Sequence, residues 1–195
     1  MKKTLAIVLA VVLVCSAFAG CGGSSSKTWT GKHDVEITIG NFGTITVEVN
    51  ADAAPETASN FLNLCKKGFY TKQTIYRAIS GFAVYGGDPN KNGTGTNGSN
   101  TIRGEFTSNG FNNTLSNTRG AIGMARDVNK DSASCRFYIL QSDQTFLDGD
   151  FAVFGYVVTG MDVIDQIASS VPVIGSDGYI AESNQPVITS VKVVN

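Results

Sequence analysis

The fold is best indicated by the segment Tyr76-Arg77-Ala78-Ile79-Ser80-Gly81-Phe82-Ala83-Val84-Tyr85-Gly86-Gly87-Asp88. The segment begins with the alternation of a β-strand, places one cation among apolar residues and ends with a pair of glycines before an aspartate. Because side chains in a strand point alternately to its two faces, we expect Arg77 to share a face with Ile75 and Ile79. An arginine on that face is either an edge residue whose charge reaches water or a fixed donor that points into a groove.

The residues before this segment predict a β-hairpin followed by a helix. Apolar and polar residues alternate over 35–39 and again over 45–49, with a glycine-containing turn between them, which is typical of two half-buried strands. The helix begins near Asp52, a side-chain acceptor, and Pro55, and it ends at Gly68. Its one apolar stripe, which needs a sheet or a barrel mouth to cover it, consists of Ala58, Phe61, Leu62 and Cys65.

The residues after the segment predict short strands and a second helix. The expected elements are, in order, a loop over 88–118, strands over 120–125, 136–139 and 152–157, a helix over about 161–169, irregular structure over 171–184, and a closing strand that contains Val187, Val191 and Val193. Many short strands with only two helices favour a closed antiparallel barrel with plugged ends.

Two short motifs mimic ligand sites without completing them. Residues 93–98 spell GxGxxG, but a polar loop follows where a dinucleotide site needs a helix. Residues 127–131 have the spaced oxygen side chains that begin a calcium loop, yet Ser132 replaces the required glycine and Tyr138 the bidentate glutamate. His33 is the only histidine and no Cys or His pair has ligand spacing, so we expect no metal, no cofactor and no histidine-activated nucleophile.

The N-terminus has the pattern of a bacterial lipoprotein leader: a charged start, a short apolar run and small residues that end at a cysteine. Residues 1–21 are therefore predicted to be a signal peptide whose Cys21 accepts the lipid, residues 22–33 a flexible Gly/Ser tether, and residues 34–195 the folded domain. We expect an exported protein anchored to the extracytoplasmic face of a bacterial membrane. An ordinary signal peptide that is cut nearby is the alternative.

Composition limits the remaining functions. The chain has 15 basic and 16 acidic side chains, and loss of the leader removes Lys2 and Lys3, so the mature protein is mildly acidic. A nucleic-acid partner would need a basic face, and none is expected. The length suits one domain with one core, and we expect a monomer. Cys65 and Cys135 remain in that domain, where a disulfide and two separate buried thiols are both open.

The segment 76–88 resembles the signature of the cyclophilin family of peptidyl-prolyl cis–trans isomerases, which runs aromatic-His-Arg-hydrophobic-Ile-Pro-Gly-Phe-hydrophobic-hydrophobic-Gln-Gly-Gly-Asp. Other similar pieces are the glycine loop 93–95, Arg103-Gly104-Glu105-Phe106, Arg136-Phe137-Tyr138-Ile139, Phe146-Leu147-Asp148-Gly149 and residues 152–157. The resemblance covers nearly everything from about residue 34 to the end. It implies a mainly β fold, a closed eight-stranded antiparallel barrel capped by two α-helices.

The resemblance also implies a site that acts on proline-containing peptides and unfolded exported proteins. It makes Arg77 the catalytic residue, as a donor to the amide nitrogen that is freed when an X–Pro bond twists. The substrate-binding set that it implies is Phe82, Ala83, Tyr85, Ala125, Arg126, Arg136, Tyr138, Phe146, Leu147 and Phe151. Of these, Phe82, Ala83, Tyr138 and Leu147 form the proline pocket, with Phe151 at its edge, while the backbone at Ala125 and Arg126 pairs with the peptide.

The chain departs from the family pattern inside that site. Tyr85 and Arg136 stand where the family has glutamines, Ala83 where methionine is frequent, and Phe151 where His or Tyr often lies. The Tyr85 hydroxyl is a candidate acceptor for Arg77, whereas Arg136 on the groove side would repel it. The first hypothesis is an isomerase for exported proteins. The alternative is a catalytically weak module that binds proline-containing peptides or a partner protein, and a structural lipoprotein is a third class.

Overall fold

The computed structural model describes residues 27–98 and 101–195, which form a mainly β domain with two α-helices. The predicted leader over 1–21, the lipid acceptor Cys21 and the first part of the predicted tether lie outside the described residues. Neither α-helix in the described segments is long and apolar enough to cross a bilayer. The same segments contain no cluster of three or more His, Cys, Asp or Glu that could hold a metal ion.

Ten strands form one antiparallel sheet, in the order β10-β1-β2-β7-β5-β6-β4-β3-β9-β8. Their bounds are β1 Lys32–Ile39, β2 Gly43–Asn50, β3 Ile75–Ile79, β4 Ala83–Gly86, β5 Ala121–Met124, β6 Phe137–Leu140, β7 Val153–Thr159, β8 Val173–Ile174, β9 Tyr179–Ile180 and β10 Ile188–Val193. The strands predicted from alternation and from apolar runs are thereby confirmed, with bounds that move by one to three residues.

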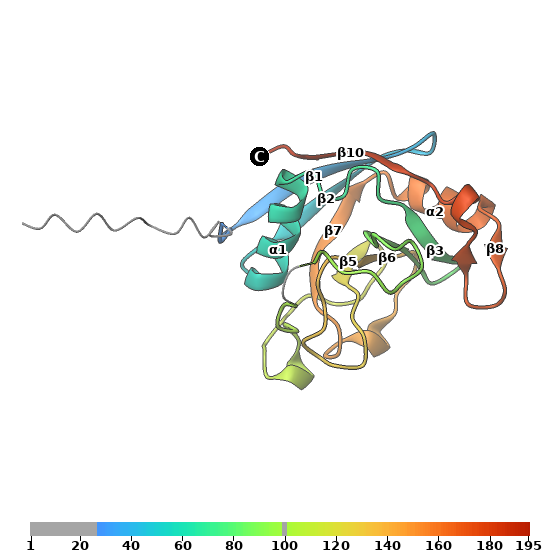
Figure 1. Ribbon diagram of the computed structural model, residues 1–195. Helices are drawn as coiled ribbons and strands as arrows, with labels where there is room; N and C mark the ends of the chain where they lie inside the picture. Colours follow the sequence, from blue (N-terminus) through green and yellow to red (C-terminus); the bar gives the residue numbers. More distant parts are fainter. Residues whose placement is uncertain (1–26, 99–100) are drawn as a thin grey trace, which may run out of the picture.

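Backbone hydrogen bonds join β3 to β10 and close eight of these strands into a barrel. Thr74 and Val187 form an antiparallel bridge, the Ile75 N–H donates to the Pro186 carbonyl at 2.9 Å, and the Ile188 N–H donates to the Gln73 carbonyl at 2.8 Å. The remaining two strands, β8 and β9, form a hairpin that extends β3 on the side of the molecule with α2 (Figure 1). The prediction of irregular structure over 171–184 is therefore wrong.

The barrel interior is filled by the inward faces of the strands, as the alternation predicts. Val35, Ile45 and Val47 have no solvent exposure, because β1 and β2 bury every second residue. Aromatic rings fill the centre, where the Phe61 ring lies 4.9 Å from that of Phe154 between centroids. Large planar side chains fill such a space without many competing rotamers, so the barrel has a packed core.

Two helices cover the barrel on opposite sides (Figure 1): α1 Pro55–Lys66 packs against β10, β2 and β7, and α2 Met161–Ser170 packs against β2, β4 and β3. Each helix buries one face, as an amphipathic cover must. The buried apolar side chains of α1 are Ala58, Phe61, Leu62, Leu64 and Cys65, and those of α2 are Val163, Ile164, Ile167 and Ala168.

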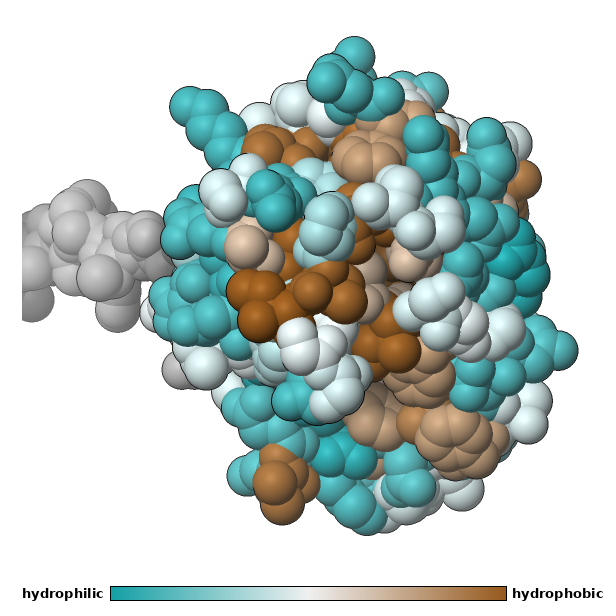
Figure 2. All heavy atoms as spheres, turned by 90° about the vertical axis from the view of Figure 1, so that its right-hand side faces the viewer, coloured by the Kyte–Doolittle hydropathy of each residue, from teal (hydrophilic) through white to brown (hydrophobic). Residues whose placement is uncertain are grey.

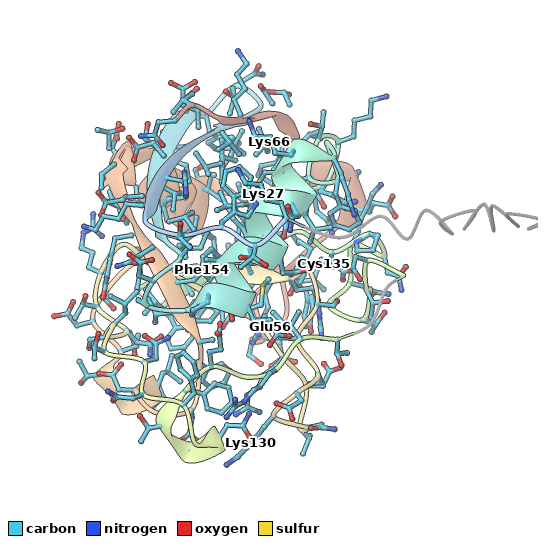
Figure 3. The ribbon with its side chains drawn as sticks, turned by 90° about the vertical axis from the view of Figure 1, so that its left-hand side faces the viewer. Lys27, Glu56, Lys66, Lys130, Cys135 and Phe154 are labelled. Atoms are coloured by element: carbon cyan, nitrogen blue, oxygen red, sulfur yellow. The ribbon has the colours of Figure 1, made fainter. Side chains whose placement is uncertain are left out.

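The N-terminus of α1 is capped from a distant segment. The buried Glu105 carboxylate accepts hydrogen bonds from the N–H groups of Glu56 at 3.0 Å and Thr57 at 2.8 Å. Figure 3 shows this end of the helix at Glu56, with Lys66 near the other end. The expected local acceptor, Asp52, instead accepts from the Gly31 N–H at 2.7 Å. The carboxylate thus ties the helix to the loop before β5.

The packed domain begins earlier than the predicted tether allows. Trp29 is only 7% exposed, its N–H donates to the Ser59 hydroxyl at 3.0 Å, and its indole N–H donates to the Asn63 side chain at 3.0 Å. β1 already begins at Lys32, so residues 27–33 pack onto the domain and are not a tether. Cys65 and Cys135 are free and buried, which decides between the two cysteine alternatives in favour of separate thiols.

Replacing Glu105 with alanine should destabilise the protein by about 1–3 kcal/mol, because two helix N–H groups lose their buried acceptor and the helix dipole loses a nearby anion. Urea unfolding of the Glu105→Ala variant measures this loss. The matched control is Glu182→Ala, which removes an exposed carboxylate paired only with Lys91 and should cost less than about 0.5 kcal/mol. Equal losses in the two variants would contradict the capping role.

Candidate active site

A pocket of about 230 Å³ opens on the barrel wall beside β3, β4 and β6. Below it lies a small buried cluster that is separate from the main core and consists of Ala83, Ala121, Tyr138, Leu140 and Val153. The residues that line the pocket are Arg77, Phe82, Tyr85, Ala125, Arg126, Tyr138, Leu140, Leu147 and Phe151. An apolar pocket bordered by two guanidinium groups suits a compact, uncharged ring with a polar group beside it.

A β-bulge turns Arg77 toward the pocket. The register of β3 against β4 shifts between Ile75, which pairs with Gly86, and Arg77, which pairs with Tyr85. The extra residue reverses the face to which the later residues of the strand point, so Ile75 lies in the main core while Arg77 lines the pocket. The expectation that Ile75 and Arg77 share a face is therefore wrong, because simple alternation does not include a bulge.

The guanidinium of Arg77 is held by neutral groups. Its Nε donates to the Asp177 carbonyl at 2.6 Å, and its central carbon lies 4.9 Å from the centroid of the Tyr85 ring and 5.4 Å from that of Tyr179. Tyr85 therefore supports Arg77 with its ring face and not with its hydroxyl as an acceptor. Burial raises the pKa of Tyr85, against the opposing effect of Arg77, so the ring stays neutral at physiological pH.

Tyr138 forms part of the buried base of the pocket. It is 3% exposed, and its hydroxyl donates to the Asn117 side-chain oxygen at 2.6 Å. Gly123 on β5 leaves space for this ring, since a Cβ there would lie 2.2 Å from the Tyr138 hydroxyl. Burial raises the pKa of Tyr138 well above its usual range, so the base of the pocket is uncharged.

The side chain of Asn117 is itself held by Asp148, which follows the pocket residue Leu147. Asp148 accepts hydrogen bonds from the Asn117 backbone N–H at 2.6 Å, from the Asn117 amide at 2.9 Å and from the Ser116 hydroxyl at 2.6 Å. Partial burial opposes the charge, but these hydrogen bonds outweigh it and lower the pKa of Asp148. The hydrogen bonds to Asp148 thus stabilise the folded protein at neutral pH, and this contribution is lost as the pH falls through the folded-state pKa of Asp148.

Arg126 closes the other side of the pocket. Its guanidinium donates to the Asp150 carbonyl at 3.0 and 3.2 Å and lies 4.6 Å from the centroid of the Phe151 ring. The Phe151 ring in turn meets Tyr138 edge-on at 6.1 Å. These contacts hold Phe151 as a wall of the pocket.

Eight of the eleven predicted site residues line the pocket, and three do not. Ala83 has no exposure and lies in the cluster below. Arg136 is 7% exposed and forms an ion pair with Asp127 at 2.6 Å and a hydrogen bond to the Gly93 carbonyl, so the expectation that Arg136 lies on the groove side is wrong. Phe146 is 71% exposed and stacks on Phe82 outside the pocket.

Sequence reasoning missed Leu140, Asp177 and Tyr179. Leu140 follows Tyr138 by two positions on β6, so the alternation of the strand could have found it. Asp177 and Tyr179 lie in the hairpin over 171–184, whose two-residue strands leave no periodic signal. No motif in the sequence places this hairpin beside β3.

Comparison with known proteins agrees with this fold. The family model of the cyclophilin type peptidyl-prolyl cis-trans isomerase/CLD matches residues 34–193. A peptidyl-prolyl cis-trans isomerase of Acinetobacter baylyi is 39% identical over 134 residues, which are 66% of this chain and 69% of that protein. Peptidyl-prolyl cis-trans isomerase A of Dickeya dadantii is 33% identical over 173 residues, 86% of this chain and 85% of that protein.

A solved structure has the same fold. The crystal structure of a Cryptosporidium parvum cyclophilin type peptidyl-prolyl cis-trans isomerase aligns with a TM-score of 0.72 at 23% identity, over 83% of this chain and 99% of that one. The fold and pocket define a cyclophilin-like barrel. The chain belongs to the cyclophilin-type peptidyl-prolyl cis-trans isomerases, and its activity is the isomerisation of X–Pro peptide bonds.

Replacing Asn117 with alanine should destabilise the protein by about 1–3 kcal/mol, because the buried Tyr138 hydroxyl loses its acceptor. Adding Tyr138→Phe should recover part of this loss, since the orphaned hydroxyl is then removed. Denaturant unfolding of the single and double variants gives the coupling free energy, and Asn112→Ala at an exposed position of the same loop is the control. Purely additive effects would contradict the link between Asn117 and Tyr138.

Proposed function

We propose that Arg77 catalyses X–Pro isomerisation by donating a hydrogen bond to the amide nitrogen of the twisted bond while the proline ring occupies the pocket of Phe82, Tyr138, Leu147 and Phe151. The observation that carries this proposal is a guanidinium fixed through Nε at the border of an apolar pocket. In the described part of the chain no hydrogen-bond partner occupies its two terminal nitrogens. They are available to a substrate.

The chemistry of the reaction needs no nucleophile and no proton transfer. Rotation about a peptide bond costs about 18–20 kcal/mol because it breaks the resonance between nitrogen and carbonyl. The twisted amide has a localised nitrogen lone pair that the planar ground state lacks, so a donor to that nitrogen stabilises the transition state selectively. Arginine suits this role because it stays charged at every working pH and its planar fork keeps a fixed geometry.

The substrate chain is proposed to pair with the backbone after β5. The N–H of Ala125 donates to the Arg136 carbonyl at 2.8 Å, so pairing at this residue falls to its carbonyl. The similar protein of Cryptosporidium parvum was crystallised in the presence of the dipeptide Ala-Pro, which supports proline-containing peptides as ligands of this pocket too. Unfolded exported proteins would supply such peptides.

Two observations weigh against the alternative of a binding module without useful catalysis. That alternative was motivated by Tyr85 and Arg136, which stand where the family has glutamines. Arg136 is paired with Asp127 and does not line the pocket, while Tyr85 supports the guanidinium of Arg77 with its ring. Both facts favour the enzyme over the binding module.

An Arg77→Ala variant should accelerate cis–trans exchange of a short Ala-Pro peptide about 100-fold less than the wild type, by analogy with the loss of one transition-state donor. Exchange NMR on residues 27–195 measures the rate, and Arg103→Ala, which removes a guanidinium outside the pocket, should leave it unchanged. Undiminished exchange in Arg77→Ala would contradict the mechanism. Shifted peptide signals without faster exchange in the wild type would favour the binding module.

We also propose that the protein acts outside the cytoplasm as a lipoprotein anchored through Cys21. Support comes from the leader pattern over 1–21. Trp29, which packs on the domain, follows Cys21 by eight residues. A fully extended link of this length spans about 27 Å, so the anchored domain would work close to the membrane surface.

A Cys21→Ser variant expressed in a bacterial host should lose lipid attachment and leave the membrane fraction, whereas the wild type should carry a diacylglyceryl group on a mature N-terminal Cys21. Mass spectrometry of the N-terminus together with fractionation tests both points. Cys15→Ser is the matched control, because Cys15 lies inside the leader and its loss should change nothing. A wild-type N-terminus at another residue without lipid would refute the anchor.

A further inference from the structure

We infer that Tyr179 of the β8–β9 hairpin is a positioning residue that orients Arg77 together with the backbone of Asp177. The inference rests on the proposed role of Arg77 and assigns a function to a segment that none of the family-like motifs covers. Tyr179 does not line the proline pocket. It acts through the arginine and not on the substrate.

The register of the sheet places Arg77 between two tyrosines. On one side Arg77 is paired with Tyr85 of β4, and on the other side it is paired with Tyr179 of β9. Side chains of directly paired residues point to the same face of the sheet. The two rings therefore flank the guanidinium, at 4.9 and 5.4 Å between ring centroid and central carbon.

The hairpin also supplies the hydrogen bond that fixes the guanidinium in rotation. Ring faces attract a cation but leave it free to turn in its plane. The 2.6 Å bond from Nε to the Asp177 carbonyl removes that freedom. Because Nε is the donor used, the terminal edge of the guanidinium is the part that remains available for a substrate.

The hairpin itself is fixed against β3 by a close backbone approach. The Ala78 N–H donates to the Gly178 carbonyl at 2.8 Å. A Cβ at Gly178 would lie 2.5 Å from the Ala78 carbonyl oxygen, and Gly178 has φ +75°, so only glycine fits there. Tyr179 is held as well, since its ring stacks on that of Tyr76 with centroids 6.3 Å apart.

Neutral support has a chemical advantage for this reaction. No carboxylate forms an ion pair with Arg77 in the described segments. A paired carboxylate would orient the guanidinium but would also neutralise much of the field that it presents to the substrate nitrogen. Two aromatic faces and one carbonyl hold the cation while leaving its net charge intact. The tyrosines and the hairpin thus orient the guanidinium without a counterion.

Tyr179 and both residues of β8 lie at the surface, so substitutions at these positions are compatible with folding. Tyr179 is 37% exposed, and its neighbours Val173 and Ile174 are 45% and 61% exposed. Figure 2 looks onto the side of the molecule that carries this hairpin, where apolar side chains gather near the centre of the view. Ile174 pairs with Tyr179 across the hairpin and is also exposed, but it has no aromatic ring that could support Arg77. The Ile174→Ala variant is therefore a matched control for the loss of an exposed side chain from this hairpin.

The experiment compares Tyr179→Leu, Tyr179→Phe and Ile174→Ala in the peptide exchange assay, with thermal unfolding as a check on folding. Tyr179→Leu should lower kcat about threefold to tenfold, the range expected for one lost cation–π contact, with KM for the Ala-Pro peptide unchanged within about twofold. Tyr179→Phe keeps the ring and should retain wild-type kcat. Ile174→Ala should retain both constants.

A double variant separates positioning from a general structural effect. In an Arg77→Ala background, Tyr179→Leu should cause no further loss, because the group that Tyr179 orients is absent. Equal losses in both backgrounds, a raised KM with unchanged kcat, or a Tyr179→Phe variant as slow as Tyr179→Leu would each overturn the inference. If Arg77→Ala alone leaves kcat unchanged, the proposed role of Arg77 fails instead, and the two failures are distinguishable.

Discussion

The backbone hydrogen bonds between residues 72–75 and 186–188 are the interaction on which the rest of the structure depends. They join β3 to β10 and turn an open sheet into a barrel, so that no long edge of unpaired backbone groups is left between these strands. They also fix the position of the chain just before Pro186. The hairpin at 173–180 ends only a few residues earlier, so closure brings it against the outer edge of β3, beside Arg77.

At the pocket and at helix α1, residues in loops provide the hydrogen-bond acceptors that fix groups on strands or helices. Strands β3, β4 and β6 supply Arg77, Tyr85 and Tyr138, and loops fix these side chains through Asp177 and Asn117. Glu105, also in a loop, fixes the start of α1 in the same way. The barrel keeps these groups at constant distance. Its own backbone carbonyls are already paired between strands, so the loops provide the additional acceptors.

Much of the fold was predictable because its periodic elements are long. The hairpin β1–β2 and both helices follow from residues such as Val35, Ile45 and Phe61, whose spacing reports burial directly. Most of the pocket followed from the family resemblance of the segments around Arg77 and Leu147. Local patterns do not report single inserted residues or two-residue strands, which explains why the bulge before Arg77 and the hairpin of Tyr179 were missed. Partners that lie far apart in sequence, such as Glu105 and Thr57, are likewise invisible to local patterns.

The first strand of the barrel is completed by the last one. β1 pairs with β2 on one side and with β10 on the other, so that Val35 lies opposite Val193, and the Asp34 N–H donates to the Asn195 side chain at 2.6 Å. A chain that leaves the ribosome or a translocation channel N-terminus first must therefore wait for β10 before the barrel can close. The barrel of this isomerase thus cannot close one segment at a time, and contacts of such sequence separation form slowly.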